Sequence, residues 1–163
     1  MTCTSDYALL DSGDGRKLER FGAHVLARPC AQAVWRPRLP PAEWEAAHAS
    51  FDRESGNRWR GREALPPHWT IEVDGLRFRL GGTDFGHLGI FPEQRESWRW
   101  IGKLVQAARA AAGEEPVRVL NLFAYSGGAT LAAARAGAEV CHLDASAGMV
   151  EWARAHAALN ALE

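Results

Sequence analysis

The stretch VLNLFAYSGG, Val119 to Gly128, decides the fold of this chain of 163 residues. It begins as an apolar run of the kind that forms a buried parallel strand, and it ends in two adjacent glycines. An alanine-rich segment follows, and its pattern predicts a short helix that Ser126 caps and Gly137 ends. A strand that turns through glycine into a helix is the opening unit of an α/β fold that binds a nucleotide-like ligand.

The same pattern continues after this helix. AEVCHLD, Ala138 to Asp144, predicts a second strand, and the remaining residues predict a second helix with an apolar stripe through Met149 and Ala153. Strand, helix, strand and helix with short links predict a right-handed parallel crossover. Asp144 follows Asn121 by 23 residues, close to the spacing of about 20 that places a carboxylate on ribose hydroxyls.

The residues of the turn distinguish between cofactors. A pyrophosphate site needs G-x-G-x-x-G, but Phe123, Ala124 and Tyr125 stand where the first glycines would be. These side chains would crowd a pyrophosphate. They suit an adenosine joined to a thioether group, with Gly127 and Gly128 letting the backbone pass close to the ligand. S-adenosylmethionine fits this description, and NAD fits it poorly.

These residues carry a resemblance to a known family. The segment from Val119 to Asn160 resembles the cofactor-binding half of class I S-adenosylmethionine-dependent methyltransferases. More narrowly, it resembles the bacterial group related to the large-subunit ribosomal RNA methyltransferases. GHLGIFPEQRESW is similar to the segment that precedes the core in that group, and DSGDGRKLERFG resembles its N-terminal region. The resemblance implies a Rossmann-like core, an S-adenosylmethionine cofactor and an RNA substrate, with ribosomal RNA as one candidate.

The resemblance also implies which residues contact the cofactor. They are Asn121, Phe123, Ala124, Tyr125, Ser126, Gly127, Gly128, Asp144, Ala145, Ser146, Phe91 and Gln94. Among them, Asp144 is expected on the ribose, and the segment from Phe91 to Gln94 beside the methionine end. Asn121 stands where many methyltransferases carry an acid, so it offers the methionine amine a hydrogen bond without a charge. The sequence assigns no catalytic residue.

The N-terminal half predicts a β-rich region. WTIEVDGLRFRL, residues 69–80, predicts a hairpin, because Asp74-Gly75 suits a two-residue turn with positive φ at both positions. Counting outward from that turn places apolar residues opposite one another on one face. HVLARP, residues 24–29, predicts a strand, and Pro41 predicts the start of a short helix. A longer helix is expected from Pro92, with a buried stripe of Trp98, Ile101, Val105, Ala108 and Ala112 before Gly113 ends it.

Two regions follow from this pattern. Residues 1–91 form a small β-rich α+β region, and residues 92–163 form the front half of a Rossmann-like methyltransferase core that stops after its second helix. In the family, the segment that positions the substrate would lie beyond Glu163. The chain therefore reads as the front of a longer enzyme that lacks the catalytic motif, with an open strand edge that favours self-association.

Composition narrows the function classes. The net charge of −1 gives no overall field that attracts nucleic acid or membrane, and no apolar run approaches a membrane span. Cys3, Cys30 and Cys141 are far apart, which supports neither a disulfide framework nor a metal site and favours a reducing, cytoplasmic setting. One local exception is RESGNRWRGR, residues 53–62, which is either a solvated loop or an RNA-facing loop in which Trp59 stacks on a base.

Three functions remain open at this point. The first is an S-adenosylmethionine-dependent methyltransferase acting on RNA, or its N-terminal fragment. The second is a non-catalytic module that binds RNA or a partner and keeps a degenerate cofactor fold as a scaffold. The third is a fragment of a nicotinamide-dependent oxidoreductase, which the crowded turn disfavours.

Residues 1–163 alone are expected to show no methyl transfer. Catalysis requires the methyl group and its acceptor to be held together, and such positioning supplies about 7–11 kcal/mol of the barrier. A radiolabelled methyl-transfer assay on bulk ribosomal RNA checks this, with the same chain joined to the missing C-terminal half as the positive control. Turnover above background from the 163 residues would show that they contain a catalytic group.

Overall fold

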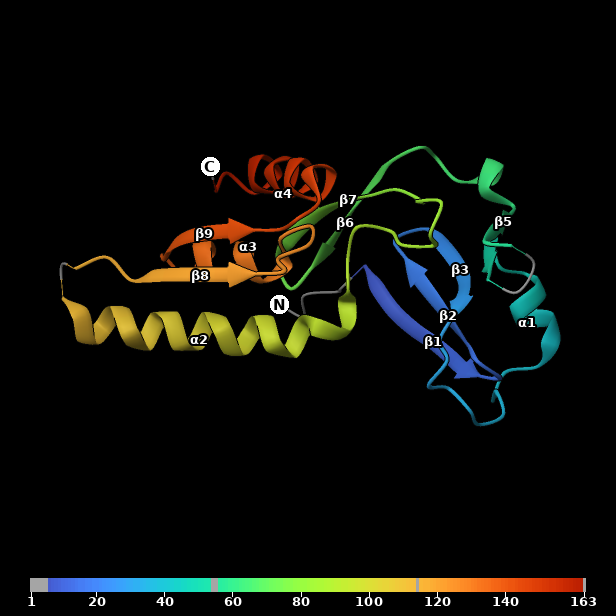
Figure 1. Ribbon diagram of the computed structural model, residues 1–163. Helices are drawn as coiled ribbons and strands as arrows, with labels where there is room; N and C mark the ends of the chain where they lie inside the picture. Colours follow the sequence, from blue (N-terminus) through green and yellow to red (C-terminus); the bar gives the residue numbers. More distant parts are fainter. Residues whose placement is uncertain (1–5, 54–55, 114, 163) are drawn as a thin grey trace. The chain divides into compact units, whose positions relative to one another are not determined.

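The computed structural model describes residues 6–53, 56–113 and 115–162 (Figure 1). The chain forms two compact units. The first contains the residues up to Glu72 together with Leu80–Leu88, and the second contains Val73–Arg79 together with Gly89–Glu163. The sequence placed the boundary after residue 91 and the whole hairpin in the N-terminal region, whereas the observed division runs through the hairpin.

A five-stranded sheet forms the first unit. Its strands lie in the order β1 (Tyr7–Gly13), β2 (Arg16–Phe21), β3 (His24–Pro29), β4 (Ala49–Asp52) and β5 (Arg58–Arg60). All neighbours are antiparallel except β3 and β4, which are parallel. The connection between that parallel pair contains α1 (Pro41–Glu45), which buries Trp44 against Leu18 and Ala27. A 3-10 turn, η1 (Arg62–Ala64), follows β5. The predicted strand at residues 24–29 and the helix start at Pro41 are confirmed.

The hairpin has the predicted elements and turn. It pairs β6 (Trp69–Val73) with β7 (Leu76–Leu80). Asp74 and Gly75 have φ values of 53° and 72°, so both adopt the left-handed conformation that a two-residue turn of this type requires. Ile71, Val73, Leu76, Phe78 and Leu80 are all buried. The alternating pattern and the turn therefore identified the buried face correctly.

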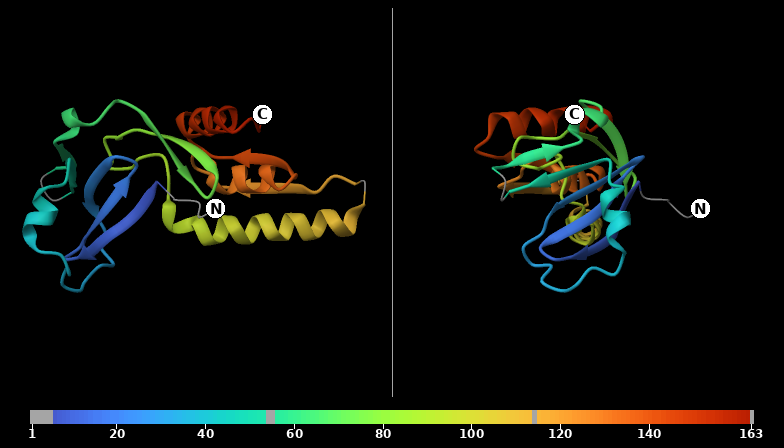
Figure 2. Two further views of the ribbon diagram at one scale, coloured as in Figure 1. Left: turned by 180° about the vertical axis from the view of Figure 1, so that it is seen from behind. Right: turned by 90° about the vertical axis from the view of Figure 1, so that its right-hand side faces the viewer.

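The second unit contains a parallel pair of strands with helices packed beside it. Its elements are η2 (Pro92–Gln94), α2 (Arg95–Ala112), β8 (Arg118–Leu122), α3 (Gly128–Arg135), β9 (Glu139–Leu143) and α4 (Ala147–Leu159). The parallel crossover is as predicted, with Asn121 paired to His142 in the β8–β9 register. Figures 1 and 2 show α2 running alongside the two strands. Val105 of α2 packs with Ala133 and Ala136, against Val119 and Val140 of the strands.

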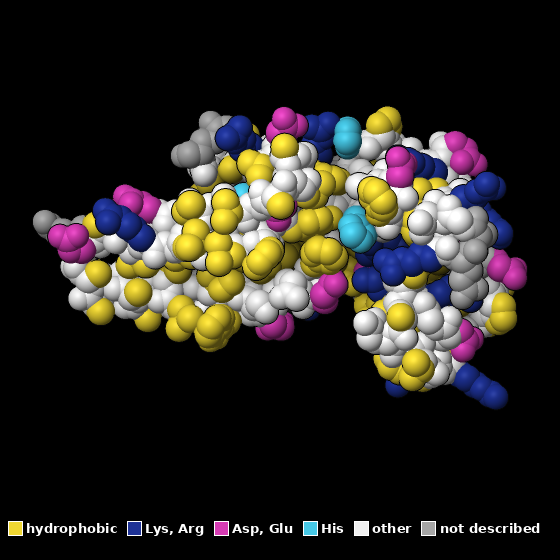
Figure 3. All heavy atoms as spheres, viewed as in Figure 1, with side chains coloured by type: hydrophobic (Ala, Val, Ile, Leu, Met, Phe, Trp, Pro, Cys, Tyr) yellow, Lys and Arg dark blue, Asp and Glu magenta, His cyan; other side chains and the backbone are white. Residues whose placement is uncertain are grey.

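The other face of the β8–β9 sheet is exposed within this unit. Leu120, Leu122 and Leu143 are 62%, 50% and 56% exposed, and Figure 3 shows hydrophobic side chains gathered over these strands. The apolar run at Val119 predicted a buried parallel strand, which needs cover on both faces. Among the described residues, helices cover only the face that carries Val119 and Val140, so that expectation is wrong for this part of the chain.

The long helix also differs in detail from its prediction. Pro92 opens a 3-10 turn, and the α-helix proper begins at Arg95. Trp98 and Val105 are buried as expected, but the stripe does not extend to Ala108 and Ala112, which are exposed. None of the described helices is long and apolar enough to cross a membrane.

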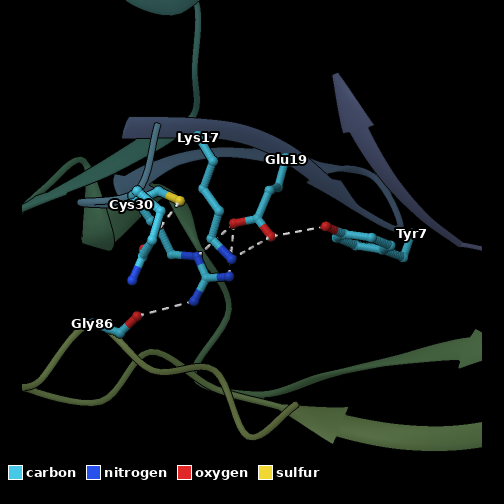
Figure 4. Close-up of polar contacts among 7 residues, drawn as sticks. Tyr7, Lys17, Glu19, Cys30 and Gly86 are labelled. Atoms are coloured by element: carbon cyan, nitrogen blue, oxygen red, sulfur yellow. Dashed lines mark hydrogen bonds and ion pairs between the residues drawn. The ribbon is translucent and has the colours of Figure 1, made fainter. Parts of the chain in front are cut away.

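The first unit contains a buried ion pair with all its partners in place (Figure 4). Glu19, fully buried on β2, accepts hydrogen bonds from Arg28 Nε and Nη2 at 2.9 and 2.7 Å. Tyr7 donates its hydroxyl to Glu19 at 3.0 Å, and Lys17 Nζ lies 3.2 Å from the same carboxylate. Arg28 also donates to the Gly86 carbonyl at 3.2 Å. The carboxylate thus joins three strands, and Arg28 ties the loop around Gly86 to them.

We expect Glu19→Ala to lower the free energy of unfolding by about 3–5 kcal/mol, because it leaves the buried Arg28 guanidinium without its carboxylate. Urea unfolding monitored by tryptophan fluorescence measures the change. Glu45→Ala removes an exposed acid from α1 and is the control, with an expected effect within about 0.5 kcal/mol. The double variant Glu19→Leu/Arg28→Met should recover part of the loss, and no recovery would contradict the unpaired-charge explanation.

Candidate functional site

The turn between β8 and α3 has a strained backbone. Phe123 and Tyr125 have φ values of 53° and 51°, a region that bulky side chains rarely adopt. Each such residue costs on the order of 1–3 kcal/mol, and strain of this kind gathers at functional sites. Phe123 is also 93% exposed, so its ring does not fill the core. Packing therefore does not explain why an aromatic residue occupies this position.

The end of β9 and the residues that follow it hold the turn from one side. The Ala124 amide donates to the Leu143 carbonyl at 3.1 Å, and the Tyr125 amide donates to Asp144 Oδ2 at 2.8 Å. Asp144 Oδ1 accepts from the Ser146 amide at 2.9 Å. Hydrogen bonds from Ser146 and then Tyr125 lower the pKa of Asp144, so the carboxylate is ionised at neutral pH. This acid fixes the turn whatever else it binds.

A buried histidine holds the turn from the other side. His156 of α4 is fully buried, with Nδ1 2.8 Å from the Ser126 carbonyl and Nε2 3.0 Å from the Arg79 carbonyl. Trp152 Nε1 donates to the same Arg79 carbonyl at 2.7 Å. Burial lowers the pKa of His156, and the two carbonyls act in the opposite direction. No pattern in the sequence indicated this role for His156.

Ser126 has a different function from the one predicted. It does not cap α3, because the N-cap residue is Gly127, with φ 91° and no side-chain cap. The Ser126 hydroxyl instead donates to the Gly89 carbonyl at 2.5 Å. The hydroxyl therefore ties the turn to the segment before α2.

The two glycines are required by the protein itself. A Cβ at Gly128 would lie 2.5 Å from the Trp98 ring, and one at Gly127 would lie 3.1 Å from the Ala153 Cβ. Gly127 also has the positive φ that disfavours other residues. The packing of α2 and α4 therefore requires small residues at both positions. The predicted close approach of a ligand to these glycines stays a prediction.

A cavity of about 290 Å³ opens beside the turn, at the lower end of the range for small-molecule sites. Its walls come from β7, the segment before α2, α2 itself, the end of β8, the turn and the start of α3. The lining residues are Phe78, Ile90, Phe91, Gln94, Ser97, Trp98, Ile101, Asn121, Phe123, Ala124, Tyr125, Ser126, Gly128 and Ala129. Phe91 packs against Tyr125 with ring centroids 4.6 Å apart. The site is therefore mainly apolar and aromatic, with a few amide and hydroxyl groups.

The structure brings most of the predicted site residues together. Asn121, Phe123, Ala124, Tyr125, Ser126, Gly128, Phe91 and Gln94 line the cavity. Gly127, Asp144, Ala145 and Ser146 do not line it, and Ser146 caps α4 by accepting from the Met149 amide at 3.4 Å. Phe78, Trp98 and Ile101 were missed. Their apolar periodicity was visible, but it indicated only a packed face.

The arginine-rich loop predicted between residues 53 and 62 is partly engaged within the first unit. Trp59 donates its indole N–H to the Thr83 carbonyl at 2.7 Å and packs on Phe51. Arg62 pairs with Asp84 at 2.8 Å. Residues 54 and 55 of this loop lie outside the described residues. These contacts give Trp59 a packing role. Its indole N–H and its contact with Phe51 are already used within the protein, which argues against stacking of Trp59 on a base.

A larger cavity of about 590 Å³ also lies in the first unit. Its charged lining mixes Arg16, Arg53 and Arg60 with Asp14 and Asp52, so it presents no strongly basic surface to a phosphate backbone. Among the residues that the structure describes, no group of three His, Cys, Asp or Glu side chains is placed to hold a metal ion.

The glycine turn and the parallel crossover are features of a Rossmann-like fold, and the aromatic cavity lies beside that turn. Residues 45–163 match the family model of S-adenosylmethionine-dependent methyltransferases. The chain belongs to this family. The family's cofactor is S-adenosylmethionine, the ligand that the turn residues favour over NAD.

Curated relatives make the similarity more specific. A ribosomal RNA large subunit methyltransferase K/L of Allochromatium vinosum is 37% identical over 89 residues, which are 54% of this chain and 11% of that protein. A protein of the same name from Pseudomonas putida is 32% identical over 111 residues, 67% of this chain and 14% of that protein. The chain thus spans only a small part of the length of these relatives.

A solved structure supports the fold. The S-adenosylmethionine-dependent methyltransferase from Agrobacterium tumefaciens is 42% identical, with a TM-score of 0.86. The match covers 99% of this chain and 51% of that one. The β-rich N-terminal region followed by Rossmann-like elements, as predicted from the sequence, is confirmed.

We expect Phe123→Gly to separate stability from ligand binding. Glycine removes the cost of the positive φ, and the exposed ring contributes little packing, so the free energy of unfolding should stay the same or rise by about 1 kcal/mol. Affinity for S-adenosylhomocysteine should fall, because a wall of the cavity is lost. Urea unfolding and isothermal titration measure the two effects. Asp14→Gly, at φ 48° in the first unit, is the control and should leave affinity unchanged. An unstable Phe123→Gly variant would contradict the strain argument.

Proposed function

We propose that the protein is an RNA methyltransferase that binds S-adenosylmethionine in the cavity beside the β8–α3 turn. The observation that carries this proposal is an aromatic cavity next to a strained turn, on the fold of this methyltransferase family. S-adenosylmethionine would supply a methyl group on a sulfonium centre. The residues of the chain would bind and orient the cofactor and exclude water from it.

The lining of the cavity fits such a cofactor. Phe91, Trp98 and Tyr125 present aromatic faces, and a ring face attracts a cation such as a sulfonium by about 0.5–2 kcal/mol. Gln94 and Asn121 place amide groups among these rings, where they can hydrogen-bond the polar methionine end. Ile90 and Ile101 complete apolar walls that suit an uncharged nucleoside.

The same lining opposes a pyrophosphate ligand. None of the described residues that line the cavity is Lys or Arg, so nothing there would neutralise phosphate charge. Phe123, Ala124 and Tyr125 occupy the part of the turn where a dinucleotide site needs glycine. A nicotinamide-dependent oxidoreductase is therefore the weaker proposal.

Asp144 is our proposed ribose-binding residue. It lies at the carboxyl end of β9, the edge of a parallel sheet where nucleotides bind. Its two oxygens each accept one backbone N–H, and each retains a further lone pair for a ribose hydroxyl. The hydrogen bonds that fix the turn would also orient the carboxylate for the diol.

RNA is the proposed methyl acceptor because the curated relatives are ribosomal RNA methyltransferases by name. A scaffold that binds RNA without catalysis is the second candidate. It would leave the cavity without a ligand, and titration therefore tests it directly. The alternative predicts that the whole protein binds neither S-adenosylhomocysteine nor NADH.

Titration of the whole protein should show binding of S-adenosylhomocysteine and none of NADH. Asp144→Ala should weaken the binding of S-adenosylhomocysteine by about 1.5–3 kcal/mol, because charge-assisted hydrogen bonds are lost. Because the acid also holds Tyr125, a modest fall in stability is expected alongside. Glu139→Ala, which removes an exposed acid from β9, the strand that Asp144 follows, is the matched control and should bind normally.

Activity is tested by radiolabelled methyl transfer from S-adenosylmethionine to bulk ribosomal RNA. Transfer by the whole protein supports the proposal. Cofactor binding without transfer to any RNA would argue against RNA as the substrate. A folded Asp144→Ala variant with unchanged affinity would remove Asp144 from the site but leave the cavity assignment intact.

A further inference from the structure

Three side chains from three elements form a hydrogen-bonded chain that ends at the cavity. Asn121 on β8 donates its Nδ2 to Thr130 Oγ1 at 2.9 Å. Thr130, in the first turns of α3, places the same oxygen 2.9 Å from His142 Nδ1 on β9. Asn121 and His142 are also partners in the parallel strand register. Of the three, only Asn121 lines the cavity.

The contact of Asn121 Nδ2 with Thr130 corresponds to one of the two directions that this chain can take. A threonine hydroxyl has one proton, and since Thr130 accepts from Asn121, it can donate that proton to His142 Nδ1. Nδ1 accepts only when the ring is neutral with its proton on Nε2. Burial lowers the pKa of His142, with opposing contributions from Asp144 and from the backbone of Tyr125, so the neutral ring is favoured at pH 7.

The direction determines which end of the Asn121 amide faces the cavity. With Nδ2 directed at Thr130, the amide oxygen Oδ1 is the group left for a ligand. The reversed chain, with the proton on His142 Nδ1 and the Thr130 hydroxyl donating to the amide oxygen, would turn the NH₂ group to the ligand instead. The two ends have nearly the same shape and opposite hydrogen-bonding character.

We propose that Thr130 and His142 are positioning residues that hold the Asn121 amide with its oxygen toward the cavity, and that this selects a ligand whose polar end is an amine. The inference rests on the proposed cofactor site. It assigns a function to two residues that do not line the cavity. Neither Thr130 nor His142 would touch the cofactor, and both act through Asn121.

Such positioning is specific to an asparagine. A carboxylate accepts hydrogen bonds through both oxygens, so its rotation leaves the ligand contact unchanged. An amide that turns by 180° replaces an acceptor with a donor and leaves an ammonium group facing N–H protons. A fixed Asn121 amide therefore favours a ligand with an amine over a ligand with a hydrogen-bond acceptor, although the residue carries no charge.

The test compares two ligands on the whole protein. S-adenosylhomocysteine carries the amino-acid end, and 5′-methylthioadenosine keeps the adenosine and thioether but lacks that end. Thr130→Val keeps the shape of the side chain and removes both hydrogen bonds. We expect this variant to lower the affinity for S-adenosylhomocysteine about tenfold, the effect of one hydrogen bond. The affinity for 5′-methylthioadenosine should stay within about twofold of the wild-type value.

Two further variants distinguish positioning from packing. Thr130→Ser retains the hydroxyl, so the ratio of the two affinities should stay at its wild-type value. His142→Phe removes the acceptor at the end of the chain and should change the ratio in the same direction as Thr130→Val. If Thr130→Val lowers the affinity for both ligands equally, or lowers neither affinity, the inference is overturned. Failure of the wild type to bind S-adenosylhomocysteine would instead overturn the proposed function.

Nitrogen chemical shifts of the histidine rings give an independent readout. Wild-type His142 should show a neutral ring with its proton on Nε2 and a hydrogen-bonded, unprotonated Nδ1. Thr130→Val should change the Nδ1 signal, and Thr130→Ser should leave it as in the wild type. A wild-type proton on Nδ1 would reverse the chain and overturn the inference.

Discussion

The second unit depends on one constraint, the left-handed backbone at Phe123 and Tyr125. These residues cost on the order of 1–3 kcal/mol each in such a conformation, so the surrounding structure must hold them there. Asp144 accepts from the Tyr125 amide on one side, and His156 contacts the Ser126 carbonyl on the other. The Ser126 hydroxyl adds the bond to Gly89. The strand end, the last helix and the segment before α2 therefore converge on a few backbone groups.

His156 extends this constraint to the hairpin. Its two ring nitrogens face carbonyls of Ser126 and Arg79, 30 and 77 residues away in the sequence. A neutral ring can donate to only one of them, and burial favours the neutral ring. Trp152 donates to the Arg79 carbonyl as well, so that group keeps a donor when the His156 proton is on Nδ1. The arrangement keeps both carbonyls satisfied without a buried charge.

The sequence predicted those features whose causes are local. Asp74-Gly75 has a turn type that only a few residue pairs adopt, and the alternation around it identified the buried face of the hairpin. The parallel crossover from β8 to β9 was predicted from the short links between the strand and helix segments. His156 could not be found in this way, because its partners are backbone carbonyls far along the chain. Trp98 was predicted as a buried helix residue, but its place in the cavity depends on how α2 packs against Gly128.

The glycines of the turn show why the cavity has a fixed form. Trp98 and Ala153 occupy the space that a side chain at Gly128 or Gly127 would need. The turn therefore takes its shape from contacts within the protein. A ligand that enters such a cavity has little backbone to order, and less of its interaction energy is lost to that ordering. The energy that holds Phe123 and Tyr125 in strain comes from folding, so the proposed cofactor site would need no binding energy to form it.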